Sequence, residues 1–156
     1  MARLLIQFAS AELAGFRWAS IDEQEQTADI AWQLAGEDEL PAIAAQHPHP
    51  VILILPQQCV YLTRVELPER AGRQLLSAIE FQIEDQLAQD IESQHFALAD
   101  PNANPVSIAV IERDIMARCM ALARAQGLRL LQVVPELFLA PWPGNSVVLT
   151  QGYGGY

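Results

Sequence analysis

The sequence predicts an α/β fold, a mixed β-sheet with flanking helices, from three observations. A short, unbroken apolar run at Val51–Leu55 is typical of a strand that is covered on both faces. An amphipathic helical pattern follows Pro68 and extends from about Glu69 to Ser93. The third observation is the order of the elements, because three consecutive strands precede an alternation of helices and strands.

Composition limits what the chain can do. Half of its 156 residues are apolar, which allows a sizeable core and argues against disorder. Its formal net charge is −10, and all nine basic residues are arginine. Because an acidic chain repels nucleic acid and anionic lipid, we expect no nucleic-acid partner, and the charge would suit a basic protein partner.

No targeting or membrane-spanning segment is visible in the sequence. The N-terminus lacks the apolar core of a signal peptide, and no apolar run approaches the ~20 residues that span a bilayer. We therefore expect a soluble chain. Cys59 and Cys119 lack the spacing of metal ligands, and we expect two buried, reduced thiols.

The first third of the chain predicts an antiparallel meander followed by a short helix. The three meander strands are expected at Arg3–Ala9, Phe16–Ile21 and Thr27–Leu34. The helix should begin at Gly36 and end at about Gln46, because acidic residues near its start complement the helix dipole. The segment His47–Pro50 then leads into the apolar strand.

The long helix after Pro68 is the element that we expect to anchor the fold. A half-buried strand at Cys59–Leu67, the expected partner of the strand Val51–Leu55, precedes this helix. The apolar stripe of the helix consists of Leu75, Leu76, Ile79, Ile83, Leu87 and Ile91. We expect this stripe to pack on the sheet that contains Val51–Leu55. Phe81 lies on the opposite side, where an aromatic ring is out of place on a solvated face.

Four shorter strands and one more helix complete the pattern. The strands are expected at His95–Leu98, Val106–Ile111, Leu128–Val134 and Ser146–Gln151. The helix should begin near Asp114 and stop at Gly127. Three meander strands followed by a helix and a strand resemble the start of each half of an actin-like (ribonuclease-H-like) fold. We therefore expect the first half of that fold and the beginning of the second.

Two groups of titratable side chains suggest a metal site at first sight. Four acids lie on the long predicted helix: Glu80, Glu84, Asp85 and Asp90. A two-metal site needs carboxylates that converge from different elements, so a solvated helix face is the better interpretation. His47 and His49 share a loop, but no cysteine or carboxylate has the spacing of a further ligand. His95 is expected at a helix end, where a cation complements the dipole.

An actin-like or sugar-kinase-like nucleotide-binding enzyme is the alternative function. Such folds place an aspartate at the end of the first strand and a glycine-containing turn after it. The segment Gln7–Gly15 contains no aspartate, and its single glycine comes late. The segment Gly152–Gly155 follows a strand but has no helix or lysine to complete a phosphate site. We therefore expect no catalytic residue and no nucleotide, metal or other cofactor.

Several short segments between residues 51 and 98 carry a family resemblance. They are Leu55-Pro56, Arg64-Val-Glu-Leu-Pro68, Ile79-Glu80, Glu84-Asp-Gln-Leu-Ala88 and His95-Phe-Ala-Leu98. Together they resemble the L component of the bacterial type II (general) secretion pathway. The rest of the chain is similar to that family only in the order of its elements.

The resemblance implies a non-catalytic cytoplasmic scaffold at the bacterial inner membrane. Its implied partners are the N-terminal domain of the secretion ATPase and other inner-membrane platform components, and a homodimer is left open. It also implies a transmembrane helix and a periplasmic domain that this chain lacks, so membrane attachment would come only through that helix. The chain would then comprise a first actin-like subdomain at residues 1–98 and an incomplete second one at 99–156.

Phe81 is the candidate anchor of a docking surface for the basic partner. On the predicted helix its neighbours include the acids Glu84, Asp85 and Glu92. A buried aromatic with charged residues around it is typical of the centre of a protein interface. The alternative is that a neighbouring element of the fold covers the ring.

Overall fold

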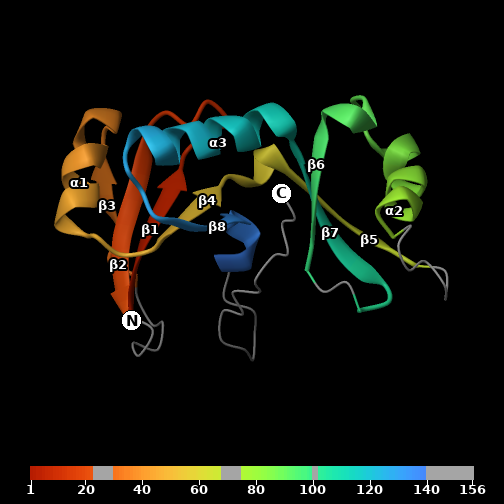
Figure 1. The fold of residues 1–156 in the computed structure, drawn as a ribbon, viewed down its shortest axis with the longest axis horizontal. Coiled ribbons are helices and arrows are strands. Elements are labelled where there is room, and N and C mark those ends of the chain that lie inside the picture. Colours follow the sequence, from red (N-terminus) through yellow and green to blue (C-terminus); the bar gives the residue numbers. More distant parts are fainter. Residues whose placement is uncertain (23–29, 68–74, 100–101, 140–156) are drawn as a thin grey trace. The chain divides into compact units, whose positions relative to one another are not determined.

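The computed structural model describes residues 1–22, 30–67, 75–99 and 102–139 (Figure 1). The chain divides into two compact units. Unit 1 is formed by Met1–Val60 together with the segment that begins at Ala117, and unit 2 is formed by Tyr61–Met116. The division of the chain into subdomains at 1–98 and 99–156 stays a prediction.

The described residues of unit 1 form a five-stranded mixed sheet in the order β3-β2-β1-β4-β8. Its strands are β1 (Ala2–Phe8), β2 (Phe16–Asp22), β3 (Gln33–Ala35), β4 (Val51–Leu55) and β8 (Leu130–Pro135). β1 pairs antiparallel with β2 and parallel with β4, and β4 pairs parallel with β8. The antiparallel pairs β1–β2 and β2–β3 confirm the predicted meander.

β4 is the most buried strand of unit 1. All five of its residues are at most 2% exposed. It has a parallel neighbour on each side, and its alternate side chains point to opposite faces of the sheet, so both faces require apolar residues. On one face the cluster contains Leu5, Ile52, Ile54 and Val134, with Ile21, Ile30 and Trp32 packed against it. Each fully buried aliphatic side chain contributes about 1.5–3 kcal/mol to folding.

The helices that follow β3 and β7 end close to where the sequence predicts, but the first of them begins at Leu40 and not at Gly36. α1 (Leu40–Gln46) follows a 3₁₀ turn at Glu37–Glu39, and the Gly36 N–H donates to Glu39 Oε1 at 2.9 Å. α3 (Arg113–Ala125) is followed by Gly127, whose φ of +64° is the left-handed conformation that ends many helices. Within the described ranges, no helix combines the length and apolar character needed to cross a membrane.

The third meander strand is shorter than predicted. Residues 27–29 of that prediction lie outside the described part of the chain, and β3 contains only Gln33–Ala35. The Trp32 N–H donates to the Ile30 carbonyl oxygen at 3.0 Å, within the same segment. This local bond diverts the N–H group from a strand ladder and turns the chain before β3 begins.

The described residues of unit 2 form a three-stranded sheet in the order β5-β7-β6 and the helix α2 (Leu75–Ile83). Its strands are β5 (Val60–Val65), β6 (Gln94–Leu98) and β7 (Val106–Glu112), and β6 pairs antiparallel with β7. The prediction that the strand after Val51–Leu55 is its partner is wrong, because β5 lies beside β7 in this sheet and β4 belongs to the sheet of unit 1. The core consists of Val65, Ile79, Ile83, Leu98, Val106, Ile108 and Val110. The subdomain boundary expected after residue 98 falls in the connection between β6 and β7.

The long helix predicted to end at Ser93 is wrong in its second half. α2 ends at Ile83, and the predicted residues 69–74 lie outside the described ranges. Two separate 3₁₀ turns follow, and Leu87 between them has an extended ψ of 139°. Leu87 and Ile91 still pack against the core of unit 2. These two apolar side chains therefore reach the core without a continuous helix, because tertiary contacts override local helix propensity.

α2 also packs on a different sheet from the one predicted. Ile79 and Ile83 are fully buried against residues of β5, β6 and β7, whereas Val51–Leu55 belongs to the sheet of unit 1. The assignment of Leu76 to the core is wrong as well, since its side chain is 54% exposed. The buried face follows the i, i+4 spacing from Leu75 through Ile79 to Ile83 and leaves Leu76 beside it.

Candidate functional site

The residues predicted to form a docking surface lie at the end of α2 and beyond it. Phe81 is on α2 and is 81% exposed. Glu84 and Asp85 follow on a 3₁₀ turn, and both are exposed. Glu92 is exposed on the separate turn Ile91–Ser93, so it does not share one helix face with Phe81 as predicted. The structure leaves the role of these four residues a prediction.

Hydrogen bonds from glutamine side chains hold the end of α2 against β5. Gln82 Nε2 donates to the Glu66 carbonyl oxygen at 2.9 Å. The Tyr61 hydroxyl donates to Gln86 Oε1 at 3.1 Å, and Gln86 Nε2 donates back to the Gln82 carbonyl oxygen at 3.3 Å. These bonds, together with the buried Ile83, hold the backbone that carries Phe81 and its acidic neighbours.

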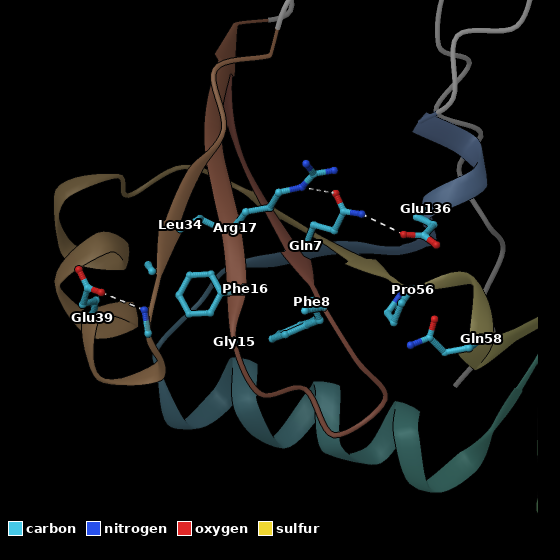
Figure 2. Close-up of a pocket in the computed structure, with 13 residues that line it drawn as sticks. Gln7, Phe8, Gly15, Phe16, Arg17, Leu34, Glu39, Pro56, Gln58 and Glu136 are labelled. Atoms are coloured by element: carbon cyan, nitrogen blue, oxygen red, sulfur yellow. Dashed lines mark hydrogen bonds between the residues drawn. The ribbon is translucent and has the colours of Figure 1, made fainter.

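A second candidate site is an open pocket of about 780 Å³ in unit 1 (Figure 2). It lies at the carboxyl ends of the parallel strands β1, β4 and β8, with the β1–β2 turn on one side. In open α/β sheets this edge is where ligands bind, at the point where the strand order reverses. Phe8, Phe16 and Pro56 contribute apolar walls, and Gln7, Arg17 and Glu136 contribute polar groups.

The polar groups of this pocket form a connected chain of hydrogen bonds (Figure 2). Arg17 Nε donates to Gln7 Oε1 at 2.9 Å, and Gln7 Nε2 donates to Glu136 Oε2 at 3.0 Å. The other carboxylate oxygen of Glu136, Oε1, accepts from the Gln57 backbone N–H at 2.8 Å. The guanidinium carbon of Arg17 lies 4.5 Å from the centre of the Trp32 ring, a cation–π contact.

The turn after β1 differs from a phosphate- and metal-binding turn. Its positive-φ positions are Leu13 and Gly15, and it contains no aspartate. Near the end of β1 stands Gln7, a neutral amide whose oxygen and nitrogen already have protein partners. Across the described residues, no group of three or more potential metal ligands comes together.

The structure also places the histidines and cysteines that the sequence analysis considered as candidate site residues. The His47 ring lies 4.9 Å from the Trp18 ring and 6.4 Å from the His49 ring. Cys59 and Cys119 are buried thiols outside any disulfide, as predicted, and burial raises the pKa of the Cys119 thiol to about 11. His95 lies in β6 and not at a helix end, so that prediction is wrong. Burial, together with the nearby Arg113 cation, lowers the pKa of His95.

Sequence reasoning missed the pairing of Gln7 with Glu136. One signal was available, because Gln7 is the only polar residue within the apolar run Leu4–Phe8 and is 9% exposed. A buried amide requires hydrogen-bond partners, so such a residue points to a polar contact at that place. Its partner could not be named, since Glu136 is 129 positions away in the chain.

Comparison with known proteins gives a consistent result. The family model for type II secretion system (T2SS) protein L matches residues 4–152. Two relatives named type II secretion system protein L, from Vibrio cholerae and Klebsiella pneumoniae, are 26% and 30% identical over 149 and 131 residues. These alignments cover 95% and 84% of this chain but 37% and 32% of the relatives. The chain therefore spans about a third of the length of these relatives.

A solved structure agrees with these sequence matches. The cytoplasmic domain of EpsL, an inner membrane component of the type II secretion system of Vibrio cholerae, aligns with a TM-score of 0.76 at 25% identity. The alignment covers 92% of this chain and 61% of that one. Fold and matches together define a component of a bacterial type II secretion system built on an actin-like fold. The chain belongs to the type II secretion system protein L family.

Proposed function

We propose that this chain is the cytoplasmic portion of an inner-membrane L protein and acts as a non-catalytic scaffold. In this role it recruits the N-terminal domain of the secretion ATPase and couples it to the other inner-membrane platform components. Family membership supports the assignment to the secretion machinery. The description of the similar Vibrio cholerae structure as a cytoplasmic domain supports the location. The net charge of −10 favours a basic partner.

The observation that carries the docking site is the exposure of Phe81. This ring is 81% exposed and is followed within four residues by two exposed acids, Glu84 and Asp85. We call Phe81, Glu84 and Asp85 the Phe81 surface, and Glu92, on the separate turn Ile91–Ser93, stays a proposed contributor to binding. Aromatic residues are enriched in protein interfaces, and a few of them commonly carry most of the binding free energy.

The anchoring of α2 supports the same site. Gln82 and Gln86 tie the segment around Phe81 to β5, so its backbone is held in place before a partner binds. A pre-organised surface loses less conformational entropy on binding, which favours affinity.

Replacement of the aromatic ring tests the proposal. Phe81→Ala should weaken binding of the ATPase N-terminal domain tenfold or more, about 1.4 kcal/mol, without lowering the melting temperature of the chain. Binding is measured by calorimetric titration, and each variant is melted in parallel. Leu34→Ala is the matched control, because Leu34 is 88% exposed on β3 in unit 1 and should leave the affinity unchanged.

The acidic residues should act mainly on the rate of association. Asp85→Asn and Glu92→Gln remove exposed negative charges that would steer a basic partner, an effect that salt screens. Stopped-flow association should therefore be slower for both variants at low salt and nearly equal to the unsubstituted chain at high salt.

Two results would contradict the role of the Phe81 ring in docking. A large drop in the melting temperature of Phe81→Ala would assign the ring to the core. Equal affinity of Phe81→Ala and Leu34→Ala would place the docking site elsewhere.

A further inference from the structure

The carboxyl ends of β1 and β4 present two hydrogen-bond donors to a single carboxylate. The Gln57 backbone N–H and Gln7 Nε2 donate to different oxygen atoms of Glu136, at 2.8 and 3.0 Å. Each oxygen therefore has its own donor (the bond from Gln7 is drawn in Figure 2). Hydrogen bonds to an ionised acceptor are about twice as strong as those between neutral groups.

Arg17 determines which way the Gln7 amide points. Its Nε donates to Gln7 Oε1 at 2.9 Å, so the oxygen of the amide faces the cation and the NH₂ group faces Glu136. Gln7 is 9% exposed, and a buried amide with both ends bonded has little freedom to turn. The positive charge of Arg17 is thereby linked to the negative charge of Glu136 through a neutral side chain.

We propose that Gln7, Gln57 and Arg17 form a carboxylate-binding cradle and that the side chain of Glu136 is its resident ligand. The cradle lies at the edge of the sheet where ligands bind in open α/β folds, between β1 and β4. The chain thus fills with its own carboxylate a position that would otherwise be available to an anion from solution.

The position of Glu136 gives this arrangement a structural role. Glu136 is the first residue after β8 and begins the 3₁₀ turn Glu136–Leu139. Occupation of the cradle therefore fastens the chain, where it leaves the sheet, to the ends of β1 and β4. The cradle should release this segment when Glu136 is replaced, and it should then accept a small carboxylate in its place.

Chemical rescue tests the proposal. Glu136→Ala should melt at a lower temperature than the unsubstituted chain. Sodium acetate at about 0.2 M should then raise the melting temperature of this variant by mass action, whereas sodium chloride at equal ionic strength should not. If Glu136→Ala is unfolded at the start of the experiment, acetate should restore its circular dichroism spectrum and chloride should not. Acetate should leave the melting temperature of the unsubstituted chain unchanged relative to chloride.

Two further variants separate a cradle from a general effect of acetate. Glu136→Gln keeps an acceptor for Gln57 but loses the charge, so its melting temperature should fall by less than that of Glu136→Ala and respond little to acetate. In Glu136→Ala the additional change Gln7→Leu removes a cradle donor and should abolish the acetate response. An unchanged melting temperature for Glu136→Ala would overturn the proposal. Recovery that is equal in acetate and chloride, or that survives Gln7→Leu, would overturn it too.

Discussion

At the scale of one residue, the surroundings of His95 change the protonation equilibrium of its imidazole ring. The residue lies half-buried in β6, and Arg113 is close enough to act on its charge. Both burial and the neighbouring cation disfavour the imidazolium form, which lowers the pKa of His95 in the folded chain. In the unfolded chain the pKa returns to about 6.5. Below that pH the unfolded state therefore binds more protons than the folded state does.

Acid should destabilise the chain in part through His95. As the pH falls through about 6.5, the free energy of unfolding should decrease, because protons favour the unfolded state. His95→Gln removes this titration, so its stability should fall less between pH 7.5 and pH 5.5. Urea unfolding of both chains at the two pH values measures the difference. An identical acid-induced loss in both would show that His95 does not contribute.

At the scale of the element, α2 shows which features hydrophobic periodicity predicts and which depend on tertiary packing. The i, i+4 spacing of Ile79 and Ile83 identified core residues correctly. The same reading extended the helix to Ser93 and placed Leu76 in the core, and both predictions were wrong. The helix ends at Ile83, and Leu87 and Ile91 reach the core of unit 2 from the segment beyond it. Hydrophobic periodicity cannot predict this arrangement, since a helical wheel is drawn for one continuous helix.

Two truncations on α2 should therefore differ sharply in cost. Ile83→Ala removes a fully buried side chain and should lower the free energy of unfolding by about 2–5 kcal/mol. Leu76→Ala acts at a side chain that is 54% exposed and should change the free energy by at most about 0.5 kcal/mol. Denaturant unfolding of the two variants measures both values. Similar losses would mean that the buried face of α2 is wrongly assigned.

The strands were predicted better than the polar contacts between them. β1, β2, β4, β6 and β7 lie within one or two residues of the predicted ranges, because apolar runs and turn residues are local signals. The bonds among Arg17, Gln7 and Glu136 join three elements that only the folded sheet brings together. Their geometry depends on strand order and register, which no local pattern contains.

At the scale of the whole molecule, the acidic charge and the occupied cradle bear on nucleotide binding. The chain carries a net charge of −10, and the sheet edge where a ligand would bind already holds the Glu136 carboxylate. Both oxygens of this carboxylate already accept hydrogen bonds from the chain, which leaves Glu136 poorly placed to bind a magnesium ion that carries a phosphate. The actin-like fold thus remains while its ligand-binding edge is engaged by the chain itself.

Magnesium ATP should therefore not stabilise the chain. A ligand present at about 100 times its dissociation constant raises the free energy of unfolding by about 2.7 kcal/mol, which is readily seen as a higher melting temperature. We expect no such rise with millimolar ATP and magnesium, relative to magnesium alone. A magnesium-dependent rise with ATP would revive the interpretation as a nucleotide-binding enzyme.

The strand order also has a consequence for synthesis on the ribosome. β4 needs β8 on its outer edge, yet β8 lies about 75 residues further along the chain. At about 5–20 residues per second, β4 waits roughly 4–15 s for that neighbour. During this interval the edge of the apolar segment Val51–Leu55 lacks β8, and an open apolar edge is a template for pairing with other nascent chains. Slower translation between β4 and β8 should therefore prolong the time during which this edge can pair with another nascent chain.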